Sequence, residues 1–86
     1  MNNKIIKAFW ECGDSQIIEF AIMRARLNVR EKKVVELLLD QCMTQEQASE
    51  ILHISTRCLQ ETWYSACRKL LRIPWVVAYG TELLNE

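Results

Sequence analysis

The sequence predicts an all-α fold, a small helical domain of about five to six helices. Apolar residues recur at spacings of three and four along most of the chain, as on one face of a helix. Only two glycines and one proline occur in 86 residues, which disfavours a turn-rich sandwich or barrel. Half of the residues are apolar and 26% are charged, so the composition is globular. The length indicates a single domain over residues 1–86.

Two helices are expected in the first part of the chain. The first lies near Lys4–Glu11, and Gly13 suits its end. Asp14 or Ser15 suits the N-cap of the second helix, which runs to about Leu27. The apolar stripe of this second helix consists of Ile17, Ile18, Ala21, Ile22 and Ala25.

A third helix is expected to begin after Asn28, which can act as its N-cap. Glu31 stands three residues later, at the position that completes a capping box. The segment Gln41–Met43 ends this helix. Its apolar positions are Val34, Val35, Leu37, Leu38 and Leu39.

A short fourth helix and a longer fifth helix follow. Thr44 is expected to cap the fourth, with Gln47 at the capping-box position. Its apolar face consists of Ala48, Ile51 and Leu52. His53-Ile54 makes a tight connection, and Ser55 caps the fifth helix. The apolar pattern of that helix runs through Cys58, Leu59, Thr62, Trp63, Ala66, Cys67, Leu70 and Leu71.

The end of the chain is read as one or two short helices. Pro74 either stops the fifth helix or opens a new one at its first turn. The segment Trp75–Tyr79 is strongly apolar and is also compatible with a strand by composition. Gly80-Thr81 suggests a break and a cap before a last turn over residues 82–86. The large aromatic residues on the flanking segments, Trp10, Trp75 and Tyr79, either complete the core or form an interface, whereas Trp63 belongs to the core.

Composition and motifs exclude several classes of protein. The chain has no stretch of about 20 apolar residues, so no membrane span is expected. No apolar signal segment follows the first residues, which favours a cytoplasmic location. The four cysteines, Cys12, Cys42, Cys58 and Cys67, have no metal-ligand spacing and are expected to be free and mostly buried. With one histidine, in a turn, and no glycine-rich phosphate loop, no enzymatic activity, metal site or cofactor is expected.

The fourth and fifth helices have the arrangement of a helix-turn-helix, with no wing. In that arrangement the first helix braces against the DNA backbone and the second presents its N-terminal face to the major groove. Ser49 supplies the small residue needed where the two helices nearly touch. His53 occupies the turn position that often adopts a left-handed conformation, and Ile54 fills the angle between the helices.

The stretch Leu27–Leu70 resembles region 4 of sigma-70-type RNA polymerase sigma factors and, more weakly, LuxR-type helix-turn-helix domains. Residues 27–34, LNVREKKV, match the family's leucine, two turn residues, Arg-Glu, charged pair and valine. Residues 44–47, TQEQ, stand where Ser/Thr-x-Glu-Glu is usual, and residues 49–55, SEILHIS, are close to the pattern Ala-Glu-Ile-Leu-Gly-Ile-Ser. Ala66, Arg68, Lys69 and Leu70 fit the end of the recognition helix.

The chain also departs from this family. Cys42 replaces a glycine, Gln47-Ala48 replaces Glu-Ile or Glu-Val, and Asn28-Val29 replaces Pro-Pro. With 86 residues the chain is too short for a complete sigma factor, so the resemblance implies a stand-alone region-4-like module. Residues 1–26 are then N-terminal helices for packing or oligomerisation, residues 27–72 the helix-turn-helix core, and residues 73–86 a tail.

The expected DNA-contacting residues lie on the outer face of the helix at residues 55–71. Arg57 suits guanine O6 and N7, and Gln60 suits adenine N6 and N7. Glu61 either accepts from cytosine N4 or is an ordinary solvated charge. The residues expected to contact bases are Thr56, Arg57, Gln60, Glu61 and Tyr64, and those expected to contact phosphates are Thr44, Gln45, Ser55 and Arg68.

Charge bears on the choice of partner. The formal net charge is zero, but residues 1–43 and 44–72 each carry +1 and the tail from residue 73 carries −2. Arg24, Arg26, Arg30, Lys32 and Lys33 form a second basic cluster that can add to a DNA footprint. The sequence therefore favours a transcriptional regulator that binds double-stranded DNA in a sequence-specific manner, as a homodimer or with a partner. The alternatives are a protein-interaction module for RNA polymerase, a sigma factor or another regulator, and an RNA-binding module.

Overall fold

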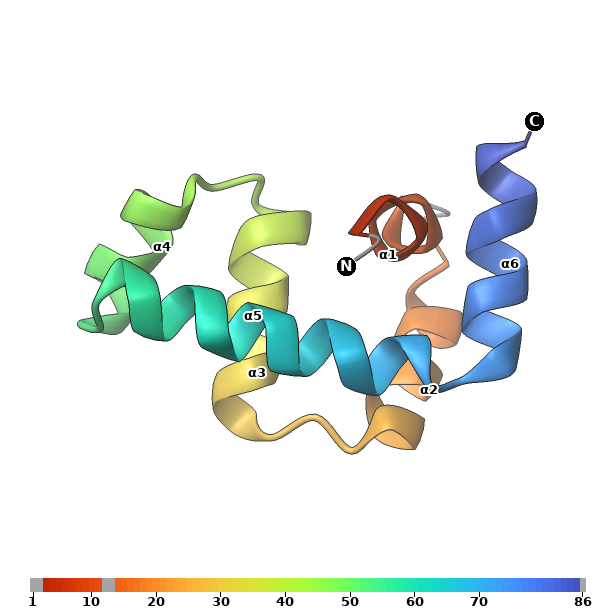
Figure 1. Ribbon diagram of the computed structural model, residues 1–86, viewed down its shortest axis with the longest axis horizontal. Helices are drawn as coiled ribbons and strands as arrows, with labels where there is room; N and C mark the ends of the chain where they lie inside the picture. The colour runs from red at the N-terminus through yellow and green to blue at the C-terminus, as the bar shows by residue number, and fades with distance from the viewer. Residues whose placement is uncertain (1–2, 12–13, 86) are drawn as a thin grey trace.

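The computed structural model describes residues 3–11 and 14–85. This part of the chain contains six α-helices, one π-helical segment (η1) and no strand, so the all-α prediction is confirmed (Figure 1). The elements are α1 (Asn3–Trp10), α2 (Ser15–Ala25), α3 (Val29–Val35), η1 (Glu36–Asp40), α4 (Gln45–Leu52), α5 (Thr56–Leu71) and α6 (Pro74–Leu84).

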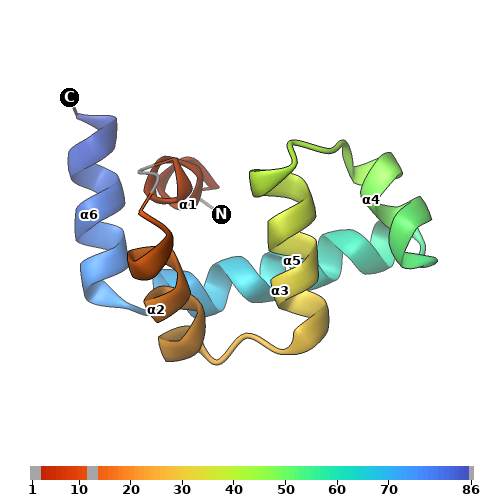
Figure 2. The same ribbon diagram turned by 180° about the vertical axis from the view of Figure 1, so that it is seen from behind.

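The long helix α5 is the centre of the fold. It contacts each of the other five α-helices. At one end of the molecule α3 and α4 pack against the first half of α5, and at the other end α1, α2 and α6 gather around its second half (Figures 1 and 2). The buried apolar residues form one cluster, to which α5 contributes Leu59, Trp63 and Leu70 and each of the other five α-helices contributes at least one side chain. The two ends of the molecule therefore share one core.

Four of the helices begin at residues whose side chains accept hydrogen bonds from backbone N–H groups. Asp14 accepts from the N–H groups of the first turn of α2, which decides between the two N-caps proposed from the sequence. Asn28 and Thr44 form complete capping boxes with Glu31 and Gln47. Ser55 caps α5. These contacts confirm the predicted helix starts, whereas Gly13 and Cys12 lie outside the described residues.

The third helix continues into a π-helical turn, which the apolar pattern did not predict. The wider turn of η1 carries Leu37 into the core and places Asp40 where its Oδ1 accepts a hydrogen bond from the indole Nε1 of Trp10. Trp10 is buried, so this bond satisfies a donor that would otherwise be left without a partner. Of the three aromatic residues on the flanking segments, Trp10 thus belongs to the core.

Helix α6 decides two alternatives that the sequence left open at the end of the chain and corrects one expectation. Pro74 occupies its first turn, so it opens a helix, and Trp75–Tyr79 is helical, not a strand. The break predicted at Gly80-Thr81 is wrong, because α6 runs unbroken to Leu84. The reason is packing: a Cβ at Gly80 would lie 2.5 Å from the carbonyl oxygen of Ile5, so glycine lets α1 and α6 approach each other closely.

Two further expectations about burial need correction. Ile51 is 49% exposed, because the short α4 meets its neighbours through Ala48, Ser49 and Leu52. The cysteines of the described part are free, but only Cys67 is buried; Cys58 is half-buried and Cys42 is exposed. Burial raises the pKa of the Cys67 thiol to about 12.

Candidate nucleic-acid interface

The connection between α4 and α5 consists of three residues, His53–Ser55. His53 adopts the left-handed conformation, with φ of 57°, and the Ile54 N–H donates to the carbonyl oxygen of Ser49 at 3.1 Å. Ser49 is buried, and its hydroxyl donates to the Glu46 carbonyl at 2.8 Å. His53 thus adopts the left-handed conformation expected of the turn, and the expected small residue, Ser49, is buried.

One face of α5 is exposed over more than three turns. Leu59, Trp63 and Leu70 face the core, as do Ala66 and Cys67. The opposite face carries the residues predicted from the sequence, and the N-cap Ser55 together with Thr44 and Gln45 at the start of α4 is exposed as well. The exposed side chains on α5 are Thr56, Arg57, Gln60, Glu61, Tyr64 and Arg68.

The nine predicted residues do not all lie together. Thr44 and Ser55 stand at the starts of α4 and α5, and Gln45 in the first turn of α4 is joined to Gln60 of α5 by a hydrogen bond. Arg68 lies three turns further along α5, about 18 Å from Thr56 at 1.5 Å per residue. The structure thus brings Gln45 next to Gln60 and Arg57 next to Glu61, with Tyr64 and Arg68 further along the same face of α5.

A hydrogen bond joins the two helices on this exposed surface. Gln60 Nε2 donates to Gln45 Oε1 at 2.9 Å, which restrains two flexible amides next to each other. One turn earlier, Arg57 Nε lies 3.5 Å from Glu61 Oε1, as an i, i+4 ion pair whose side chains are 89% and 70% exposed. Such an exposed pair contributes little free energy, so it can open when another acceptor approaches the guanidinium.

The capping hydroxyls keep a free donor. Thr44 Oγ1 accepts from the Gln47 N–H at 3.1 Å, and Ser55 Oγ accepts from the Cys58 N–H at 3.1 Å. Because a hydroxyl can donate while it accepts, each O–H remains able to donate a hydrogen bond to an anionic oxygen. Both side chains are held by their own helix starts, which is the geometry needed for positioning contacts to a phosphate.

Sequence reasoning missed a buried charged network that fixes α5 against α3. Glu31 is 2% exposed. Its Oε1 accepts from Lys69 Nζ at 2.6 Å and from the Asn28 N–H at 2.9 Å, and its Oε2 accepts from Ser65 Oγ at 2.6 Å. Burial by itself raises the pKa of Glu31, but the hydrogen bonds from Lys69, Ser65 and Asn28 and the charge of Lys69 outweigh it and lower the pKa below its ordinary value.

The only sequence signal for this network was indirect. Ser65 and Lys69 stand four residues apart, beside the apolar stripe of α5, so their side chains project toward a neighbouring helix. The network also changes the electrostatics, since the charge of Lys69 is neutralised by Glu31 and is directed away from the exposed face.

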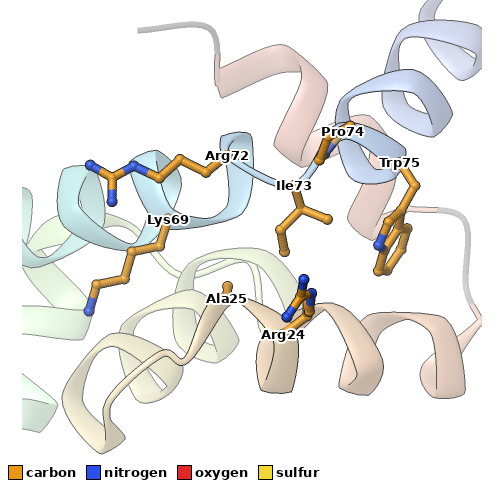
Figure 3. A pocket seen from close by; sticks show the side chains of 7 residues that line it. All are labelled: Arg24, Ala25, Lys69, Arg72, Ile73, Pro74 and Trp75. Carbon is orange, nitrogen blue, oxygen red and sulfur yellow. The ribbon is translucent and has the colours of Figure 1, made fainter.

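The basic cluster predicted between the second and third helices is divided by the structure. Arg30 Nη1 lies 3.8 Å from Cys58 Sγ, next to the first turn of α5. Arg24 lies at the other end of α5, where it lines a hollow of about 320 Å³ with Lys69 and Arg72 (Figure 3). Lys32 pairs with Glu19 at 3.9 Å. Of these contacts, only that of Arg30 adds a cation near the start of α5.

Metal binding, membrane insertion and likeness to known proteins bear on other functions. Within residues 3–11 and 14–85, no group of three or more His, Cys, Asp or Glu side chains is arranged to hold a metal ion. Among the helices of the same residues, none is both long and apolar enough to cross a membrane. Comparison with protein-family models, curated proteins and solved structures finds no match to this chain.

Proposed function

We propose that this protein is a sequence-specific DNA-binding transcriptional regulator that inserts α5 into the major groove. The observation that carries the proposal is the exposed polar face of α5, which begins at one end of the molecule, where α4 braces α5 across a three-residue turn. A short helix fixed against a longer one is the geometry by which a helix-turn-helix docks on DNA. The resemblance of residues 27–70 to sigma-70 region 4 supports the same proposal.

The chemistry of the exposed face suits base edges. The guanidinium of Arg57 can pair with guanine O6 and N7 once its exposed ion pair with Glu61 opens. Gln60 can pair with adenine N6 and N7, and its bond to Gln45 holds the amide in place before DNA arrives. We therefore assign base readout chiefly to Arg57 and Gln60, with Thr56, Glu61 and Tyr64 as secondary contacts.

Phosphate contacts follow from the ends of the helices. Thr44 and Ser55 offer capping hydroxyls, and the adjacent N-terminal turns of α4 and α5 offer backbone N–H groups. Arg30 and Arg68 supply the charge, because Lys69 is already paired with Glu31. With about three cations facing DNA, the slope of log affinity against log salt is expected to be near −3 for one molecule, a modest value for a DNA-binding protein.

The test is selection of bound sequences from random duplex DNA, followed by fluorescence anisotropy with the selected site. Arg57→Ala is expected to weaken specific binding about 5- to 150-fold and to relax the preference at one base pair. Arg68→Ala is expected to weaken all sequences equally and to lower the salt slope by about one. Lys4→Ala, an exposed cation on α1, serves as the matched control and leaves affinity within about twofold.

Two outcomes would overturn the proposal. One is the absence of any salt-dependent binding to duplex DNA by the wild-type protein. The other is equal binding by the wild type, Arg57→Ala and Gln60→Ala on every selected site, because the exposed face of α5 would then play no part in recognition.

A second candidate function is a protein-interaction module that engages RNA polymerase, a sigma factor or another regulator. The zero net charge favours it, as does the small number of cations near α5. Co-precipitation with purified polymerase distinguishes the two functions: an interaction module binds polymerase and shows no preference among the selected duplexes, whereas a DNA-binding regulator shows one.

A further inference from the structure

Helices α2 and α6 expose a cluster of large apolar side chains at the end of the molecule opposite to α4. Phe20 and Met23 on α2 are 63% and 73% exposed, and Trp75 and Tyr79 on α6 are 36% and 37% exposed. We call these four residues the α2–α6 face. Contiguous exposed apolar groups of this kind usually mark a site of association rather than an ordinary solvated surface.

The face is built on rigid aromatic packing. Phe20 and Trp75 lie with ring centroids 5.9 Å apart, which joins the two helices. Beneath them the fully buried ring of Phe9 makes edge-to-face contacts with Trp75 at 6.0 Å and with Tyr79 at 5.9 Å. The exposed rings are therefore held in place by the core, so little conformational entropy is lost when a partner covers them.

The shape of the face suits a second copy of the same surface. The exposed side chains of Phe20 and Met23 protrude from this face, which also carries a shallow, open depression of about 360 Å³ lined by Gln16, Ile17, Phe20 and Trp75. Because a two-fold interface brings the same patch together with itself, it needs both a protruding group and a hollow that receives it. The α2–α6 face offers both.

The α2–α6 face has basic side chains near one end and an acidic side chain near the other, so its charges can pair with those of a second copy. Arg24 and Trp75 both line the hollow of about 320 Å³ at the start of α6, and the residues that line this hollow include no carboxylate (Figure 3). Glu82 is exposed on the same stripe of α6 as Trp75 and Tyr79, and it lies about 12 Å from Pro74 along the helix. A two-fold axis between these ends would bring Arg24 of one molecule to Glu82 of the other.

We propose that two copies of this chain associate through the α2–α6 face to form a homodimer. The face lies at the far end of the molecule from the start of α5 (Figures 1 and 2), so association leaves both α5 surfaces free. The advantage of the dimer rests on the proposed function, because a second copy doubles the few phosphate contacts that one molecule offers.

The experiment is sedimentation equilibrium of the whole chain, with folding checked by circular dichroism. The wild type is expected to dimerise with a dissociation constant on the order of 10 μM, a value suited to a small interface. Met23→Glu, at a position whose side chain is mostly in solvent, is expected to weaken the dimer at least about tenfold. The matched control is Val29→Glu on α3, which places the same charge at a position that is 87% exposed and away from the face.

Charge reversal tests the two-fold arrangement itself. Arg24→Glu and Glu82→Arg are each expected to weaken the dimer about fivefold or more, and the double variant is expected to restore it, because each reversed charge then faces its new partner. A wild type that stays monomeric at about 200 μM would overturn the proposal. Equal effects of Met23→Glu and Val29→Glu, or a double variant no better than the singles, would do so too.

The outcomes separate this inference from the proposed function. A dimer that shows no preference among duplex DNA sequences would support the proposed interface and overturn the proposed function. A monomer that binds the selected DNA would do the reverse, and it would assign the α2–α6 face to a partner other than a second copy.

Discussion

Replacing Glu31 by glutamine tests whether an ionised carboxylate, and not only its shape, holds α5 against α3. The substitution keeps the size of the side chain and removes the charge. In the wild type the carboxylate accepts three hydrogen bonds, from Lys69, Ser65 and the Asn28 N–H. Glutamine can form three corresponding hydrogen bonds. Its amide oxygen still accepts from Lys69 and from the Asn28 N–H, and its NH2 group donates to Ser65 Oγ, which reverses the direction of that bond.

The expected cost follows from these contacts. Hydrogen bonds to charged groups contribute about 1.5–3 kcal/mol each, against about 1 kcal/mol between neutral groups. Lys69 is 35% exposed, so its ammonium keeps some water when the carboxylate is lost. That hydration holds the cost below the 3–5 kcal/mol or so of breaking a fully buried pair. We expect Glu31→Gln to lower the free energy of unfolding by about 2 kcal/mol at neutral pH.

The cost should depend on pH in a defined direction. The pKa of Glu31 is lowered in the folded protein relative to the unfolded chain, despite its burial, by its hydrogen bonds and by Lys69. A lowered folded pKa means that the carboxylate stabilises the fold fully above the unfolded pKa of about 4.3. This contribution is lost as the pH falls through the folded pKa. The difference between wild type and Glu31→Gln should therefore shrink in acid.

Urea unfolding followed by tryptophan fluorescence measures this difference at about pH 7, 5 and 3.5. The control is Glu61→Gln, which removes an exposed carboxylate from an i, i+4 pair and should change the free energy of unfolding by less than about 0.5 kcal/mol. The reasoning is refuted if Glu31→Gln is as stable as the wild type at neutral pH. It is refuted equally if the loss is the same in acid.

Three further substitutions or treatments have defined outcomes. Gly80→Ala should lower the free energy of unfolding by about 1–3 kcal/mol, because its Cβ would lie 2.5 Å from the Ile5 carbonyl oxygen. Thermal unfolding measures this loss as a lower midpoint. Ser55→Ala should cost about 1 kcal/mol in urea unfolding through loss of the α5 cap, and Ser55→Thr should retain most of it. A thiol reagent at about pH 8 should label the exposed Cys42 rapidly and Cys67 only as the protein unfolds, since burial raises the Cys67 pKa to about 12.

Each of these has a result that would contradict it. A stabilised Gly80→Ala would mean that the gain in helix propensity, about 1 kcal/mol, exceeds the clash with α1. A Ser55→Ala variant as stable as the wild type would mean that water replaces the capping hydroxyl without loss of free energy of unfolding. Labelling of Cys67 at the rate of Cys42 would mean that the core opens locally around α5.

Local chemistry made the helix starts predictable. The bonds of Asn28 to Glu31 and of Thr44 to Gln47 each span three residues, so sequence spacing alone identifies them. The exposed face of α5 was predictable for the same reason, because the buried residues of that helix recur at helical spacing. Both the elements and the outer face therefore follow from contacts within one turn of chain.

Contacts between distant parts of the chain were not predictable. The bond from Lys69 to Glu31 joins residues 38 positions apart, and nothing in the spacing of either helix identifies its partner. Helix propensity predicts a break at Gly80 because glycine is a poor helix former, whereas the absence of a Cβ there lets α1 come close. The bond between Gln45 and Gln60 likewise depends on the angle at which α4 meets α5.

The packing of α1 on α6 has a consequence for synthesis on the ribosome. These two helices make the most extensive contact of any pair although they lie at opposite ends of the described chain. Chains grow at about 5–20 residues per second, so Ile6 and Phe9 emerge seconds before the helix that covers them. Until then the nascent chain carries an uncovered apolar helix that chaperones or proteases can recognise. Burial of α1 is thus completed only after α6 has been made, so a chain truncated before Pro74 should be degraded rapidly in cells.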